Sequence, residues 1–150
     1  MPGLGHGHHI EVVAYAADNA QSTGDVLTYA PTMPGKVKRF GFIVTEAFSA
    51  TDNLILALDL RPTLKDDTNR AEKATLTIAS GNSAAADPGD LYYREFEQAV
   101  AVGQEVVLDL TNAVAAGAAQ YFIHYEPYAF QPNAGATGWP ASGNVVKATS

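Results

Sequence analysis

The sequence contains no cysteine among its 150 residues and no uninterrupted apolar run of membrane-spanning length. Without cysteine the chain has no disulfide, no thiol nucleophile and no thiolate metal ligand, which suits a reducing cytoplasm. A membrane-spanning helix needs about 18 or more consecutive apolar residues, so we expect no membrane partner. The first residues also lack the basic start and apolar core of a secretory signal, and we expect synthesis in the cytoplasm.

Positive charge is scarce and unevenly placed. The chain has 9 Lys and Arg against 16 Asp and Glu, a net charge of −7, and residues 1–35 contain no Lys or Arg. A nucleic-acid-binding surface normally needs a basic patch, so we expect no nucleic-acid partner. The exception is the cluster Lys36, Lys38 and Arg39, which is typical of a solvated sheet face or strand edge. Contact with an acidic partner surface is the alternative.

Helical periodicity is nearly absent. Only residues 111–117 predict a single helical turn, which Thr111 or Asn112 would cap and Gly117 would end. The rest of the chain alternates apolar and polar residues between Gly, Pro, Asn and Asp, the pattern of strands and turns. The predicted strands are residues 9–17, 25–30, 36–48, 53–60, 73–79, 91–97, 104–110 and 120–126.

Two predicted strands place their large apolar residues on one face, which we assign to the core. A third, residues 36–48, alternates Phe40 and Phe42 with Gly41, and a glycine inside a strand marks a bulge or the close approach of a neighbour. We expect that strand to be central in its sheet. The one-sided residues of the first two strands are Leu54, Leu56, Leu58 and Leu60, and Val106, Leu108 and Leu110.

Eight short strands without intervening helices predict an all-β fold, an antiparallel β-sandwich of two packed sheets. We prefer a jelly-roll-like connectivity over an immunoglobulin-like one, because the strand count fits and the Cys, Trp, Cys signature is absent. Residues 62–73 and 80–90 form long connections, and loops of that length are often functional.

The ends of the chain differ from the predicted domain at residues 10–127. Residues 1–9 are rich in Gly and Pro and predict an extended N-terminal arm. Residues 128–150 predict a C-terminal arm that is rich in Pro, Gly, Ala and Ser yet carries Tyr128, Phe130 and Trp139. Because disordered tails are usually poor in aromatics, we expect this arm to dock, either on its own sandwich or on a neighbouring subunit.

His6, His8 and His9 raise the question of a metal site. Zinc centres favour ligands on a fixed scaffold, whereas these histidines lie on a glycine-rich arm that would have to be ordered. We therefore predict no dedicated metal centre and keep weak metal binding as an alternative. Histidines titrate near neutral pH, so the arm would carry a switchable charge.

Catalytic patterns are also missing. There is no Gly-x-Ser-x-Gly, and the only histidine outside the arm, His124, shares its predicted face with Phe122, which favours a packed structural histidine. The acids Glu95, Glu97, Glu105 and Asp109 could supply paired carboxylates, but strand alternation places such acids along solvent faces. Residues 65–72 lack an EF-hand pattern and predict a solvated loop. We predict no catalytic residue, no cofactor and no enzymatic activity.

Two stretches carry a resemblance to a known family. PGKVKRFGFIVTEAFSATDNLILALDLRPT and VAVGQEVVLDLTNAVAAGAAQYFIHYEP resemble the small all-β decoration, or cement, proteins on the outer capsid of tailed bacteriophages. The resemblance covers roughly the middle two-thirds of the chain and consists of the residue pattern of the strands, not of a diagnostic motif. It implies a non-enzymatic protein, often trimeric, whose termini clamp neighbouring major capsid proteins, and it carries over no catalytic or ligand residue.

We therefore expect a structural virion protein on the outer capsid surface that bridges subunits of the major capsid protein and forms a homotrimer or another homo-oligomer. The alternative is a glycan-binding β-sandwich with Trp139, Tyr92 and Tyr93 as stacking platforms, followed by a β-sandwich hydrolase or lyase. The residues predicted to dock partners are Leu4, His6, His8, His9, Lys36, Lys38, Arg39, Tyr128, Phe130 and Trp139.

Overall fold

The computed structural model describes residues 12–49, 53–64, 66–83 and 86–128. The chain divides into two units, one of Glu11–Glu126 and one of Met1–Ile10 with Pro127–Ser150. Only Pro127 and Tyr128 of the second unit are described. Apart from Tyr128, both predicted arms therefore lie outside the described residues.

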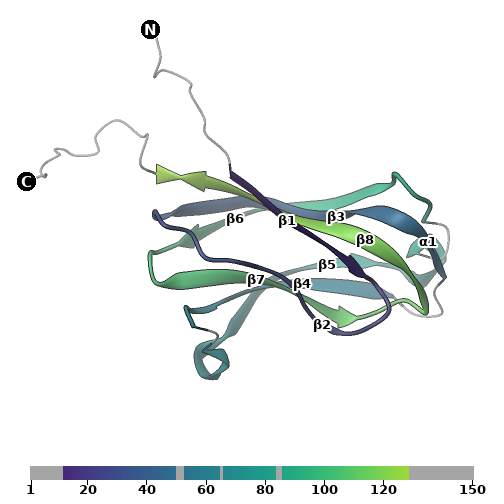
Figure 1. Ribbon diagram of the computed structural model, residues 1–150, viewed down its shortest axis with the longest axis horizontal. Coiled ribbons are helices and arrows are strands. Elements are labelled where there is room, and N and C mark those ends of the chain that lie inside the picture. The colour runs from purple at the N-terminus through teal and green to yellow at the C-terminus, as the bar shows by residue number, and fades with distance from the viewer. Residues whose placement is uncertain (1–11, 50–52, 65, 84–85, 129–150) are drawn as a thin grey trace, which may run out of the picture. The chain divides into compact units, whose positions relative to one another are not determined.

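Strands dominate the described residues, as the alternation of β-branched and aromatic residues with polar ones predicts (Figure 1). Each of the eight predicted strands overlaps one observed strand. Two one-turn helical segments lie in the connections on either side of β5. The elements are β1 (Val12–Asn19), β2 (Gly24–Tyr29), β3 (Gly35–Ser49), β4 (Leu54–Pro62), η1 (Asp67–Asn69), β5 (Ala71–Ile78), α1 (Ser80–Ser83), β6 (Leu91–Val100), β7 (Gln104–Asn112) and β8 (Ala116–Pro127).

The strands form two four-stranded sheets, with the orders β1-β8-β3-β6 and β2-β7-β4-β5. Antiparallel pairs join β1 to β8, β2 to β7, β3 to β6 and β4 to β5. The first four strands thus run against the last four like one long hairpin wrapped into two layers, which is jelly-roll connectivity. The prediction of an all-β, jelly-roll-like sandwich is confirmed, and β3 is an inner strand as expected.

The core lies between the two sheets and contains the faces that the sequence assigned to it. On β3, Phe40 and Phe42 are fully buried, and the alternate residues face outward. On β8, Tyr121, Ile123 and Tyr125 point inward, so that Phe122 lies on the opposite face. The remaining core residues of the central strands include Val44, Leu54, Leu56, Leu58, Leu60, Val106, Leu108 and Leu110.

The predicted helical turn at residues 111–117 is wrong. β7 continues to Asn112 and β8 begins at Ala116, because the start of β8 is recruited to pair with the end of β1. Gly117 lies inside β8 with a φ of 128°, a conformation that favours glycine. A Cβ there would lie 2.5 Å from the Phe48 ring, so the glycine serves packing and does not end a helix.

No helix in the described residues is long and apolar enough to cross a membrane. The two helical segments span only Asp67–Asn69 and Ser80–Ser83. The first of them belongs to the β4–β5 connection, which lies against the β2-β7-β4-β5 sheet.

Candidate functional site

The solvent-facing side of the β1-β8-β3-β6 sheet carries an open apolar hollow. Large apolar side chains that would normally be buried are exposed here: Tyr15 is 63% exposed, Leu91 54% and Tyr93 49%. Contiguous apolar patches on a soluble domain mark interaction sites. We call this hollow of about 370 Å³ the outer groove, and its lining residues are Val13, Tyr15, Arg39, Ile43, Leu91, Tyr93, Gln120, Phe122 and His124.

Strand register brings these side chains together from four separate parts of the chain. Tyr15 of β1 lies opposite Phe122 of β8, and Ile43 of β3 lies opposite Leu91 of β6. Each pair joins two apolar side chains on one face, the arrangement that stabilises neighbouring strands. The groove is therefore a continuous property of the sheet and does not depend on a loop.

Gly41 lies in the middle of this face, between Arg39 and Ile43 on β3. A Cβ added at Gly41 would lie 2.1 Å from the Tyr92 carbonyl oxygen and 2.7 Å from the Tyr93 Cα. The backbone of β6 therefore approaches β3 more closely than a side chain at position 41 would permit. The expected close neighbour of Gly41 is confirmed. The missing side chain lets β6, which carries Leu91 and Tyr93 of the groove, pack closely against β3.

The polar members of the outer groove lie among its apolar walls. The His124 ring lies 5.2 Å from the Phe122 ring, centroid to centroid, which matches the expectation of a packed histidine. Arg39 pairs with Glu95 on β6 through a long Nη2–Oε2 contact of 3.5 Å. Its Nε is buried and donates no hydrogen bond to any described residue.

Lys36 and Lys38 lie beside the outer groove, and their charges are matched within the chain. Each ammonium lies 3.3 Å from a Glu97 carboxylate oxygen and 3.9 Å from Glu126. Hydrogen bonds from the two lysines hold the pKa of Glu97 below its usual value. The cluster lies on a sheet face of an inner strand, not at an edge, and its contact with a partner remains a prediction.

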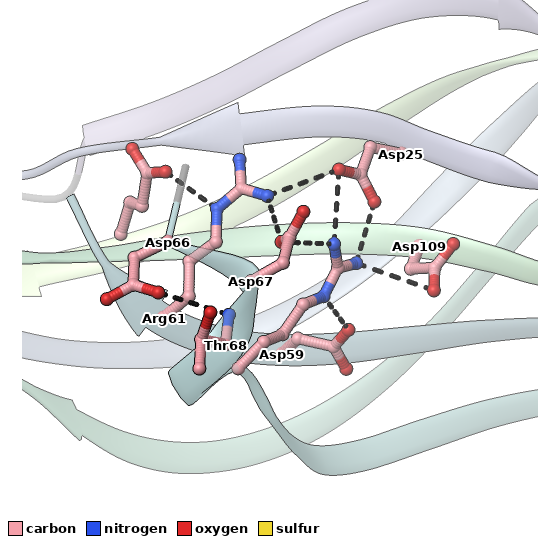
Figure 2. A network of polar contacts seen from close by, with 9 residues as sticks. Asp25, Asp59, Arg61, Asp66, Asp67, Thr68 and Asp109 are labelled. Carbon is pink, nitrogen blue, oxygen red and sulfur yellow. Dashed lines mark hydrogen bonds and ion pairs between the residues drawn. The ribbon is translucent and has the colours of Figure 1, made fainter. Parts of the chain in front are cut away.

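The outer face of the other sheet is organised around a buried arginine. Arg61 of β4 is only 2% exposed, and its Nε donates to Glu105 of β7 at 2.7 Å. Its Nη1 donates to Asp67 of the β4–β5 connection at 2.7 Å (Figure 2). Burial opposes the charge on Arg61, but the two hydrogen bonds outweigh it and raise its pKa. Arg61 thus fastens the connection to the sheet.

Arg70 completes this network from the other end of η1. It donates to Asp59 at 2.7 Å and to Asp25 at 2.6 Å, and it pairs with Asp109 at 3.4 Å. Figure 2 shows the carboxylates of Asp25, Asp59, Asp67 and Asp109 converging on the two guanidinium groups. Asp67 joins this network although its side chain stays 62% exposed, in keeping with the predicted solvated loop. The prediction that Glu105 lies on a solvent face is wrong, because its pairing with Arg61 leaves it only 6% exposed.

The network pairs both guanidinium groups and, among the described residues, is not arranged as a metal site. Five carboxylates surround two guanidinium groups, and each carboxylate is within ion-pair distance of at least one of them. In the part of the chain that the structure describes, no group of three or more His, Asp or Glu is placed to hold a metal ion. Residues 6–9, for which weak metal binding was the alternative, lie outside that part.

The structure places the predicted docking residues unevenly. Tyr128 is the last described residue, directly after β8. Lys36, Lys38 and Arg39 lie together on β3, with Arg39 lining the outer groove. The remaining predicted docking residues, Leu4, His6, His8, His9, Phe130 and Trp139, lie outside the described residues.

The aromatic residues predicted to stack on a sugar do not share one surface. Tyr92 is wrong as a platform, because it turns inward and stacks on Phe42 with ring centroids 5.3 Å apart. Burial accordingly raises the pKa of its phenol. Tyr93, one residue later, points outward and lines the outer groove, whereas Trp139 is not described.

Sequence reasoning missed most of the groove. Val13, Tyr15 and Leu91 were assigned no role, although alternation fails at two points that contribute to it. Val12, which follows Glu11, is itself followed by a second apolar residue, Val13, and residues 91–93 read Leu-Tyr-Tyr. A strand that is apolar on both faces should be covered on both faces, and this signal could have indicated the site.

Neither the models of known protein families nor the curated proteins include a match to this chain.

Proposed function

We propose that this chain is a non-enzymatic structural virion protein that decorates the outer capsid of a tailed phage and bridges subunits of the major capsid protein. The observation that carries the proposal is the pairing of the first and last strands. Val12 of β1 lies opposite Tyr125 of β8. Residues 1–11 and 129–150 are therefore attached at the same end of neighbouring strands, where two segments can engage one partner surface.

The domain between these segments supports such a role. It contains its own core between two sheets, and we expect it to fold without the terminal segments. Segments that order only on a partner cost about 1–2 kcal/mol per residue, and burial of apolar side chains together with backbone pairing must offset that cost. Phe130 and Trp139 supply apolar surface in the longer segment.

Glycan binding is the second candidate, and the outer groove favours it. Tyr15 and Tyr93 expose their rings there beside Arg39 and Gln120, which can donate hydrogen bonds to hydroxyl groups. The aliphatic half of the groove, formed by residues such as Leu91, offers no such recognition and is better suited to protein side chains. We therefore rank shell bridging first.

The test is co-sedimentation of the full-length chain with undecorated tailed-phage heads assembled from purified major capsid protein. We expect saturable binding and a higher temperature of head disruption. Chains lacking residues 1–8 or 129–150 should remain folded but lose most of their binding, and the longer deletion should cost more because it removes Phe130 and Trp139.

Circular dichroism provides the control for folding of the truncated chains. Truncated chains that decorate heads at full occupancy would place binding on the sheet faces and overturn the role of the terminal segments. A full-length chain that ignores heads and binds an oligosaccharide array would replace the proposal with the second candidate.

A further inference from the structure

The outer groove is too small to be one half of a face-to-face dimer. Aromatic side chains carry about 150–250 Å² each, so the exposed parts of Tyr15 and Tyr93 amount to on the order of 200 Å². With Val13, Ile43 and Leu91 the patch reaches on the order of 400 Å². A stable protein interface buries about 800 Å² on each partner. The groove is the right size for a chain segment, which adds contact area on several sides.

One segment of this chain has the matching chemistry. Residues 129–150 contain Phe130, Trp139, Val145 and Val146, and their only charged side chain is Lys147. The outer groove is lined by no carboxylate, and its one guanidinium is already paired with Glu95. The apolar side chains of this segment can therefore enter the groove without burying an unpaired carboxylate of the groove or of the segment.

The direction of β8 indicates which copy offers the groove. Phe122 and His124 of β8 line the groove, and the strand continues to Pro127. The end of the strand is thus about 10 Å beyond His124 at about 3.3 Å per residue, so β8 has passed the groove of its own copy where it ends. To enter the groove of its own copy, the segment that follows would have to reverse direction, whereas the groove of a neighbour requires no such reversal.

We propose that residues 129–150 of one copy dock in the outer groove of a second copy, with Trp139 as the central anchor. The inference rests on the proposed bridging function and names the contact between copies. Such a contact is heterologous, because a segment of one copy meets a groove of the next. Heterologous contacts that close by rotation form rings, in keeping with the predicted homotrimer.

Trp139 is the only tryptophan in the chain and reports directly on this contact. The donor is full-length protein with Tyr15→Lys and Leu91→Lys, which blocks its groove and keeps Trp139. The acceptor is full-length protein with Trp139→Ser, which keeps its groove and emits no tryptophan signal. Both substituted groove residues are exposed, and melting curves verify that each variant is folded.

Mixing donor with acceptor should shift Trp139 emission to shorter wavelength and protect it from acrylamide, with saturation as acceptor is added. Replacing the acceptor by one that also carries Tyr15→Lys and Leu91→Lys should weaken association about tenfold or more, the effect of losing central anchors. The matched control acceptor carries Thr28→Lys and Thr77→Lys, at exposed positions of the other sheet, and should bind normally.

Two results would overturn the inference. Wild-type Trp139 that is shielded at every dilution, with no change on mixing donor and acceptor, would place the segment on its own domain. Trp139 that is never shielded, in a protein whose groove binds an oligosaccharide array, would assign the groove to glycans. Because the experiment contains no heads, binding to heads without this exchange would overturn the inference and leave the proposed function standing.

Discussion

The two outer faces of the sandwich meet water in opposite ways. On the β2-β7-β4-β5 sheet, Arg61 and Arg70 bind carboxylates from three strands and the β4–β5 connection at distances down to 2.6 Å. On the β1-β8-β3-β6 sheet, Tyr15, Leu91 and Tyr93 remain about half exposed or more. One face is saturated by its own partners, whereas the other leaves apolar surface uncovered.

The difference shows which face can gain from a partner. Charged groups that already bind one another would have to give up short hydrogen bonds before they could bind anything else, and that exchange yields little net free energy. Exposed apolar side chains lose only water on docking, at about 25 cal/mol per Å² buried. The β1-β8-β3-β6 face is therefore the surface at which association is favourable.

Removing the centre of the saturated face should have the largest effect. Arg61→Met leaves Glu105, which is 6% exposed, as a buried carboxylate without its guanidinium. We expect the free energy of unfolding to fall by about 3–5 kcal/mol, measured by urea denaturation. The control is Arg61→Met combined with Glu105→Leu, which removes both charges and should recover most of the loss. An Arg61→Met loss below about 1 kcal/mol would mean that the network contributes little.

Two leucines test the assignment of inside and outside. Leu108 is fully buried, whereas Leu91 is 54% exposed in the outer groove. Leu108→Ala should cost about 2–5 kcal/mol, since it opens a cavity in the core. Leu91→Ala should stay within about 0.5 kcal/mol, as exposed positions do. Equal losses in thermal or urea unfolding would contradict the exposure of the groove in the free protein.

The sequence was sufficient for the strands and the core because both depend on local alternation. Leucines at every second position of residues 54–60 predict one buried face whatever the neighbouring strands are, and the structure buries them. The lack of helices indicated a sandwich, and the strand count and the missing Cys, Trp, Cys signature favoured the jelly-roll connectivity. The false helical turn at residues 111–117 arose because a short small-residue run has no alternation to reveal a strand.

The two outer faces could not be derived in the same way. Arg61 and Asp25 are 36 residues apart in the chain and meet only because β2 and β4 both flank β7. Tyr15 and Tyr93 reach one groove only through the order β1-β8-β3-β6. Strand pairing between distant parts of the chain decides both the arginine network and the outer groove, and this pairing cannot be derived from a single sequence.

Gly41 tests whether the groove depends on the close approach of β6. Gly41→Ala places a Cβ 2.1 Å from the Tyr92 carbonyl oxygen, so the backbone of β6 must move. We expect a loss of about 1–3 kcal/mol in thermal unfolding, the usual cost of overpacking, and a weaker signal in the Trp139 exchange experiment. Gly81→Ala is the matched control, since a Cβ there meets nothing within 4 Å. Equal stability of the two variants would contradict a role of Gly41 in shaping the groove.

Acidification should have the smallest effect and should act on both faces. Hydrogen bonds from Arg61 and Arg70 lower the pKa of Asp67 from its usual 3.8, and those from Lys36 and Lys38 lower that of Glu97 from 4.5. A lowered pKa in the folded state gives stability that is present above the usual pKa and is lost as the pH falls through the lowered one. The melting temperature should therefore decline between about pH 5 and about pH 2.

Asp109 opposes this trend, because burial raises its pKa from 3.8 and its protonation relieves a cost of folding. The net decline should hence be modest, and it should shrink further in Asp67→Asn and in Glu97→Gln, each of which removes one carboxylate that titrates. Melting curves of the three proteins across this pH range measure the difference. If Asp67→Asn loses as much stability on acidification as the wild type, then the Arg61–Asp67 hydrogen bond does not stabilise the saturated face, and the contrast between the two faces reduces to the exposed groove alone.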